Sequence, residues 1–207
     1  MPQYELIYFN AAGRAEPIRL CFHYANIPFK DTRVEVNEWA ELKHDRKKVP
    51  FGLLPVLLVD DKPLCESHAI IRYVAKLTDL DGGSNTDEVA HLDQCYELCR
   101  SFHEATRAYF LACRGYGHED KTKLLDNVFV PNVEKYFGHI RSQLRPSGFF
   151  GNTVTYVDFA WFRIIEFYNQ HNPEVIQNHP EFLGHGRRIR DIPQLQNYFK
   201  NRPETAF

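Results

Sequence analysis

The apolar residues in the first third of the chain alternate between the spacing of strands and the spacing of helices. Residues 3–9 and 29–36 are rich in aromatic and β-branched side chains, which predicts two strands. Between them, apolar side chains recur at the spacing of one helical face, and these are Ile18, Cys21, Phe22 and Ala25. A strand, a helix and a further strand predict a parallel pair joined by a crossover.

A looser segment with Trp39 and Lys43 follows, and then a second α/β pattern begins. Residues 55–59 and 63–65 read as strands, separated by a turn at residues 60–61. A helix is predicted from Ser67, with one apolar side formed by Ile70, Ile71, Val74 and Leu77. The order β-α-β, then β-β-α, predicts a first domain over residues 1–78.

The pattern after this domain is helical throughout. Residues 79–86 are polar and glycine-rich, which predicts a linker. Long helices are expected over residues 89–109 and 124–144, the second kinked or interrupted by Pro131. Further helices are expected from residue 156 and near residues 180–190 and 194–200. The chain is therefore predicted to be a small α/β domain followed by an all-α domain over residues 87–207.

Thr155 lies three residues before Asp158, at the start of the helix expected from residue 156. A hydroxyl and a carboxylate at this spacing can each bind the backbone N–H near the other, which stabilises a helix start. We expect this pair to be structural.

Composition excludes several classes of protein. The 207 residues are 43% hydrophobic and 25% charged, as in a soluble globular protein. The net charge of −2 provides no basic field for nucleic acid or anionic membrane. No apolar run is long enough to span a bilayer, and residues 1–10 do not read as a secretory signal, so a cytoplasmic protein is expected.

The cysteines and histidines point to neither a disulfide framework nor a metal site. The five cysteines include no Cys-x-x-Cys pair, which fits a reducing compartment. The ten histidines lack the close spacing of metal ligands. No Gly-x-Gly-x-x-Gly or Walker loop occurs. We therefore expect no metal.

Residues 50–70, PFGLLPVLLVDDKPLCESHAI, combine a proline-broken strand with a helix start. Pro55 keeps Leu54 extended, and a proline belongs at a strand edge or turn, where a peptide-like ligand could pair with the Leu54 backbone. The helix start at Ser67 suits a carboxylate, and Glu66 beside it suits an ammonium. The segment would then bind a short peptide with a free amino-acid head. Alternatively, Ser67 is an ordinary N-cap and Glu66 a favourable first-turn charge.

Four stretches, YELIYFNAAGRAEPIRL, PFGLLPVL, ESHAIIRY and GNTVTYVDF, resemble those of cytosolic glutathione transferases, and they are most similar to the sigma class. The resemblance covers the whole chain. It implies a thioredoxin-like domain with a cis Pro55, an all-helical domain, a homodimer and glutathione as co-substrate. The peptide ligand with a free amino-acid head would then be glutathione.

The resemblance also implies roles for individual residues. Tyr8 would point its hydroxyl at the glutathione sulfur, and Arg14 would support the thiolate. The remaining residues implied in glutathione binding are Trp39, Lys43, Gly52, Leu53, Leu54, Pro55, Glu66 and Ser67. A hydrophobic substrate pocket is expected to include Phe9, Ala12, His103 and Phe207.

Departures from sigma-type members change what is carried over. Leu53 replaces a Gln or Lys, and Glu66 replaces a Gln, although other classes in the family use Glu there. Ser101 replaces an acidic residue of the prostaglandin D synthases, which puts a cross-subunit contact to glutathione in doubt. Arg100 disrupts their acidic metal cluster, so no divalent ion is carried over.

Three functions follow from this resemblance. The leading one is an enzyme that conjugates the glutathione thiolate to hydrophobic electrophiles in detoxification, with prostaglandin isomerisation as a further reaction. The alternative is a non-catalytic carrier of haematin or another hydrophobic ligand. A structural role, as in lens crystallins of this fold, is opposed by the presence of Tyr8 and Arg14.

Overall fold

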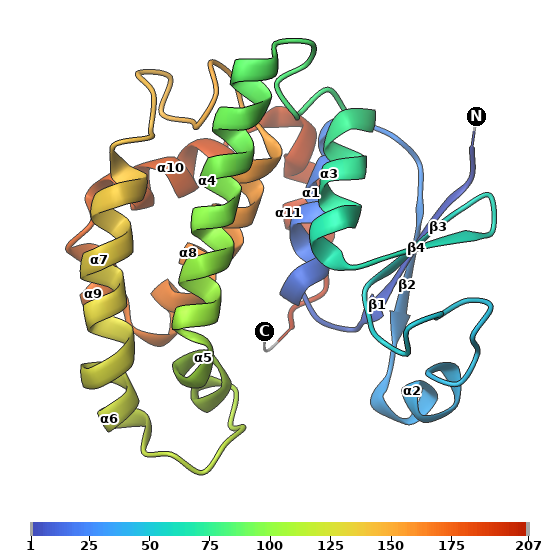
Figure 1. Cartoon of the computed structure of the whole chain (residues 1–207), viewed down its shortest axis with the longest axis horizontal. Coiled ribbons are helices and arrows are strands. Elements are labelled where there is room, and N and C mark those ends of the chain that lie inside the picture. Colours follow the sequence, from blue (N-terminus) through green and yellow to red (C-terminus); the bar gives the residue numbers. More distant parts are fainter. Residues whose placement is uncertain (1, 206–207) are drawn as a thin grey trace. The chain divides into compact units, whose positions relative to one another are not determined.

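The computed structural model describes residues 2–205, which form two compact units (Figure 1). The first unit contains the residues up to Asp81 together with the segment from Ile192, and the second contains Gly82–Asp191. The sequence pattern assigned the segment from Ile192 to the helical domain, whereas the structure packs it within the first unit. None of the helices within residues 2–205 is long and apolar enough to cross a membrane.

A four-stranded sheet with the order β2-β1-β3-β4 organises the first unit. Its strands are β1 (Tyr4–Phe9), β2 (Lys30–Val34), β3 (Val56–Val59) and β4 (Lys62–Cys65). The predicted parallel crossover is confirmed, because β1 pairs in parallel with β2. β3 pairs antiparallel with both β1 and β4.

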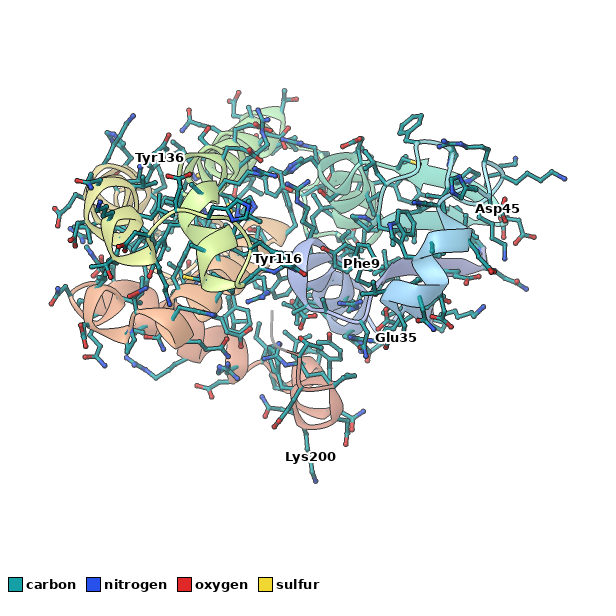
Figure 2. The ribbon with its side chains drawn as sticks, turned by 90° about the horizontal axis from the view of Figure 1, so that it is seen from below. Phe9, Glu35, Asp45, Tyr116, Tyr136 and Lys200 are labelled. Atoms are coloured by element: carbon teal, nitrogen blue, oxygen red, sulfur yellow. The ribbon has the colours of Figure 1, made fainter. Side chains whose placement is uncertain are left out.

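Alternation along β1 decides which side of the sheet each side chain faces. Tyr4 packs its ring against Phe22 of α1 (Glu16–Tyr24), with ring centroids 5.4 Å apart. Tyr8 is four residues further along the strand and therefore faces the same side. Phe9 faces the opposite side, where its ring lies 5.5 Å from that of Trp39 in α2 (Val36–Leu42). Figure 2 labels Phe9 and Glu35, at the strand ends beside α2.

Helix α2 replaces the looser segment expected around Trp39. Its start is fixed by a capping box, in which the Glu35 side chain accepts from the N3 backbone N–H and Glu38 accepts from the Glu35 backbone N–H. Trp39 and Leu42 pack against the buried cluster formed by Ile7, Val34, Val49, Val56 and Leu58. The two glutamates and this apolar contact together explain a helix that hydrophobic spacing alone does not reveal.

Two further helical segments of the first unit pack near α1. The predicted helix from Ser67 is confirmed as α3 (Ser67–Leu77). The segment from Ile192 forms the 3-10 turn η3 (Pro193–Leu195) and α11 (Gln196–Asn201). Tyr198 of α11 stacks on His23 of α1 at a centroid distance of 4.2 Å, while Lys200 points away from the unit (Figure 2).

The second unit is helical, as expected. Its helices are α4 (Thr86–Ala105), α5 (Arg107–Cys113), α6 (Lys121–Leu124), α7 (Val130–Arg141), α8 (Tyr156–His171), α9 (Pro173–Gln177) and α10 (Pro180–Arg190). Their core is aromatic, with Phe102 in ring contact with Phe129, Phe137 and Trp161.

Both long helices predicted for this unit are interrupted. The helix predicted over residues 89–109 divides at Thr106 into α4 and α5. The Thr106 hydroxyl and N–H both donate to the Phe102 carbonyl, and such a side-chain bond to the preceding turn often bends a helix. The helix predicted over residues 124–144 is interrupted just before Pro131, as expected. A π-helical turn, η2 (Leu125–Phe129), joins α6 to α7, and Asn132 Nδ2 donates to the Val128 carbonyl at 2.7 Å.

The pair at the start of α8 forms the expected capping box. The Asp158 side chain is fully buried and accepts four hydrogen bonds, from the Phe150 N–H, the Thr155 N–H, the Thr155 hydroxyl and His185 Nε2. Four donors around one buried carboxylate indicate a structural role, as the sequence predicted.

Candidate functional site

Tyr8 lies near the end of β1, where the chain turns back over its side chain through residues 10–14. The backbone N–H of Arg14 donates to the Tyr8 hydroxyl oxygen at 3.2 Å. Because this oxygen already accepts a hydrogen bond, the hydroxyl proton is left to donate to another group. Accepting one bond also makes the hydroxyl a better donor in the next. The loop therefore prepares Tyr8 to donate to an acceptor outside the loop.

Gly13 makes this approach of the loop to Tyr8 feasible. Its φ is +43°, and a Cβ at this position would lie 2.6 Å from the Tyr8 hydroxyl oxygen. Any side chain there would displace the hydroxyl or the loop. No motif in the sequence distinguishes Gly13. The only local signal is a glycine in the turn after a strand, and such glycines are common.

Trp39 and Lys43 occupy the C-terminal end of α2. The Lys43 N–H donates to the Trp39 carbonyl, and the Lys43 side chain is exposed. Gly52 has a φ of +64°, and a Cβ at this position would lie 3.5 Å from the Lys43 carbonyl oxygen. This contact brings the 50–54 segment beside the end of α2, so a cation and an indole lie close to an exposed stretch of backbone.

The Leu54–Pro55 peptide bond is cis, as the family resemblance implies. Pairing of β3 with its neighbours begins at Val56. Within residues 2–205, the Leu54 N–H and carbonyl take no backbone partner. Both groups are therefore open to a ligand with an extended backbone. Leu53 beside it is 60% exposed and offers no polar side-chain group.

Glu66 has an unusual backbone conformation at the start of α3. Its φ is +68°, in the left-handed region that residues other than glycine rarely adopt, and such conformations cost about 1–3 kcal/mol. It occupies the N-cap position, but its side chain makes no capping hydrogen bond. The carboxylate is exposed, whereas Ser67 is buried.

This geometry contradicts the N-cap role that the simpler alternative gave to Ser67. Ser67 is the first helical residue rather than the N-cap, and Glu66 does not cap the helix with its carboxylate. The Glu66 side chain therefore does not cap α3, and its exposed carboxylate is available to a cation.

The residues expected to bind glutathione all belong to the first unit. Tyr8 and Arg14 are in direct contact, as are the rings of Phe9 and Trp39. Ala12 of the expected hydrophobic pocket lies in the same loop as Arg14. His103 belongs to the second unit, where its ring lies 5.0 Å from that of Phe110, and Phe207 lies outside the described residues.

The cysteines provide no ready nucleophile. Burial raises the pKa of the Cys65 thiol, which lies beside Glu66, and raises that of Cys95 to about 12. Burial likewise raises the pKa values of the other three thiols, those of Cys21, Cys99 and Cys113. Chemistry on a sulfur at Tyr8 would therefore need a thiol supplied by the ligand.

Groups of three or more His, Cys, Asp or Glu placed to hold a metal ion are absent among residues 2–205. Arg100, which was expected to disrupt an acidic cluster, pairs with Glu97 of the same helix at 2.6 Å. Its cation therefore neutralises one of the acidic groups on that helix face.

Two family models match the chain. The glutathione S-transferase N-terminal domain matches residues 4–76, and the glutathione S-transferase C-terminal domain matches residues 102–202. The chain belongs to the glutathione S-transferase family. The family resemblance inferred from sequence is thereby confirmed, and so is the fold class of a thioredoxin-like domain followed by a helical one. Members of this family use glutathione as co-substrate.

Individual relatives match over their full length. The chain is 33% identical over 216 residues to probable glutathione S-transferase 5 of Caenorhabditis elegans, with 100% of both chains covered. It is 32% identical over 210 residues to human hematopoietic prostaglandin D synthase, with 99% of both covered.

Solved structures of glutathione transferases show the same fold. A major nematode-specific glutathione transferase of Caenorhabditis elegans superposes with a TM-score of 0.94 at 33% identity, over 100% of both chains. Na-GST-3 of Necator americanus, described as monomeric, gives 0.92 at 33% identity, over 99% of this chain and 100% of that one.

Proposed function

We propose that this protein is a sigma-type glutathione transferase that conjugates the glutathione thiolate to hydrophobic electrophiles in cytoplasmic detoxification. The observation that carries the proposal is the hydrogen bond from the Arg14 N–H to the Tyr8 hydroxyl oxygen. It leaves the Tyr8 proton directed to an external acceptor, and the chain's own thiols are unsuited to that role. The thiol of glutathione is the acceptor that this family supplies.

The chemical step depends on the acidity of that thiol. A free thiol has a pKa of about 8.5 and is mostly protonated at neutral pH. A hydrogen bond from Tyr8 and the positive charge of Arg14 both favour the thiolate. A pKa lowered by about 2 units corresponds to about 2.7 kcal/mol of selective stabilisation of the charged form. The thiolate then attacks the electrophile and displaces its leaving group, or adds to it.

The rest of the tripeptide is held by the groups around it. An extended tripeptide is about 10 Å long, so it can reach both ends of the site. The exposed Lys43 and the half-buried Trp39 suit its glycyl carboxylate, and the open backbone of Leu54 suits its cysteinyl unit. The Glu66 carboxylate suits the ammonium of its γ-glutamyl head, and the positive end of the α3 dipole at Ser67 suits the carboxylate of that head.

The electrophile would bind beside the sulfur. Phe9 and Ala12 are the half-buried apolar residues of the first unit nearest in sequence to Tyr8 and Arg14. His103, which the family resemblance also implies for the pocket, belongs to the second unit and stays a sequence-based prediction. The pocket residues set which electrophiles are accepted, while Tyr8 sets the reactivity of the sulfur.

A homodimer is part of the proposal. Phe51 is 62% exposed next to Leu53, which is 60% exposed. Two large apolar side chains on one surface loop favour contact with another protein surface, here a second copy of the chain.

The test of the proposed function is turnover of an aromatic halide with glutathione by the purified protein and by Tyr8→Phe. Losing a charge-assisted hydrogen bond costs about 1.5–3 kcal/mol, so turnover should fall about 10- to 150-fold. Glutathione affinity should change little. The thiolate absorbance of the glutathione complex, followed against pH, should shift to higher pH. If turnover and absorbance both stay unchanged, Tyr8 is not the activating donor.

A further inference from the structure

A buried ionic cluster lies beneath the Tyr8 loop and plays no part in the mechanism above. Its members are Glu16, Arg19, Asp31, Tyr198 and Arg202. The Glu16 and Arg19 side chains are 1% and 0% exposed. Burying a charge costs free energy even when it is paired, and an apolar replacement is often as stable. Stability alone therefore does not explain why charged side chains are buried beneath the Tyr8 loop.

Arg19 binds the backbone of the loop directly. Its Nη1 donates to the Ala11 carbonyl at 2.8 Å and to the Ala12 carbonyl at 3.4 Å. The peptide units of these residues immediately precede Gly13 and Arg14. Holding them fixes the direction of the Arg14 N–H, which donates to the Tyr8 hydroxyl.

Arg19 also lies beneath the Tyr8 ring itself. Its guanidinium carbon is 6.0 Å from the ring centroid, on the α1 side of the sheet that Tyr8 faces. The guanidinium is fixed from the other side by Asp31 of β2, whose two carboxylate oxygens lie 3.0 and 3.1 Å from Nε. Arg19 thus joins the sheet, the loop and the Tyr8 ring through one rigid planar group.

Glu16 connects this group to the segment from Ile192. It accepts from Arg19 Nη1 at 3.4 Å, from the Tyr198 hydroxyl at 2.8 Å and from Arg202 Nη1 at 2.8 Å. Burial alone would raise the pKa of Glu16, but the charges of Arg19 and Arg202 outweigh it and hold the pKa below its usual value. Thr205 adds a direct contact, because its hydroxyl oxygen accepts from the Ala12 N–H at 3.2 Å.

We propose that Arg19 is a positioning residue for thiolate formation: it holds the Ala11 and Ala12 carbonyls so that the Arg14 N–H stays on the Tyr8 hydroxyl. Glu16, held by Tyr198 and Arg202, keeps Arg19 in place. This inference rests on the proposed function, because it concerns the donor that activates glutathione.

The test compares Arg19→Lys with wild type. Lysine keeps the charge but has a single nitrogen, which cannot bind Asp31 and the loop carbonyls together. We expect the apparent pKa of enzyme-bound glutathione, read from the thiolate absorbance, to rise by about 0.5–1 unit, the equivalent of one ordinary hydrogen bond. Turnover below this pKa should fall about 3- to 10-fold, and the difference should narrow as the pH rises.

The matched control is Arg163→Lys in α8. Arg163 is also buried and stands over an aromatic ring, that of Phe167, but it belongs to the second unit. The Arg163→Lys substitution should lower the melting temperature and leave the pKa of the bound glutathione thiol as in wild type. Arg202→Met, which removes one holder of Glu16, should raise the thiolate pKa less than Arg19→Lys does.

Tyr8→Phe is measured in parallel to separate the two levels of the proposal. If the thiolate pKa rises in Tyr8→Phe but not in Arg19→Lys, Arg19 is only structural and the proposed function stands. If the thiolate pKa rises in neither variant, the positioning role of Arg19 and the proposed function are both overturned. In the double variant, Arg19→Lys should add nothing to the shift of Tyr8→Phe, because Arg19 acts through Tyr8. Additive shifts would contradict the positioning role.

Discussion

At the scale of single residues, the strained backbone of Glu66 gives a sharp test of glutathione recognition. If its exposed carboxylate receives the ammonium of glutathione, Glu66→Ala removes a charge-assisted contact worth about 1.5–3 kcal/mol. The dissociation constant should rise about 10- to 150-fold, and less where water replaces the carboxylate. Glu66→Gln should weaken binding less, because an acceptor remains. Calorimetric titration with glutathione measures the dissociation constants of wild type, Glu66→Ala and Glu66→Gln.

The control for this prediction is a ligand that lacks the amino group. Desamino glutathione should bind wild type and Glu66→Ala with nearly equal affinity, because the contact that distinguishes them is gone. A coupling free energy near zero between the two deletions would mean that Glu66 only starts α3.

Local sequence patterns identify some residues of the candidate site, but they do not identify others. Glu66 and Ser67 stand out because a carboxylate and a hydroxyl precede an apolar helix. Gly13 and Arg19 do not stand out. Their roles depend on a 2.6 Å approach to Tyr8 and on carbonyls eight and seven residues back in the chain. Such contacts exist only after the loop has folded over the sheet.

At the scale of elements, the start of α8 should depend strongly on Asp158. Its removal takes away a helix cap and leaves buried donors, including His185, without an acceptor. We expect Asp158→Ala to lower the free energy of unfolding by about 2–5 kcal/mol. Turnover per folded molecule should stay unchanged. Chemical denaturation and activity of the folded fraction measure the two effects.

Asp126→Ala is the matched control, because Asp126 is an exposed aspartate in the same unit. It should change stability by no more than about 0.5 kcal/mol. Unchanged unfolding of Asp158→Ala together with lost turnover would contradict the structural role and make Asp158 part of the site.

The elements themselves were predictable where one apolar face or strand pattern dominates, as in β1, α3 and α8. They were not predictable where polar bonds override the spacing. Helix α4 ends before Thr106, whose hydroxyl donates to a carbonyl of the preceding turn, although the apolar pattern continues past it. The short helix α2 depends on two glutamates and on contact with a core made by distant strands.

At the scale of the whole molecule, the proposed homodimer predicts a mass of about twice the 24.3 kDa chain in sedimentation equilibrium. Phe51→Ser should raise the dimer dissociation constant at least about 10-fold, since buried aromatic anchors dominate interfaces. Tyr116→Ser, which changes a 54% exposed aromatic of the second unit, is the control and should leave the mass unchanged. A wild-type protein at the single-chain mass would contradict the homodimer.

The contacts of Glu16 also bear on the order in which the protein is completed during synthesis. Its partners Tyr198 and Arg202 follow it by 182 and 186 positions, and the whole second unit is translated in between. Domains generally fold as units from the N-terminus during synthesis. Until the segment from Ile192 is made, Glu16 lacks two of its donors in the nascent first unit. The loop proposed to activate glutathione would therefore be completed late, although its residues are among the first to be made.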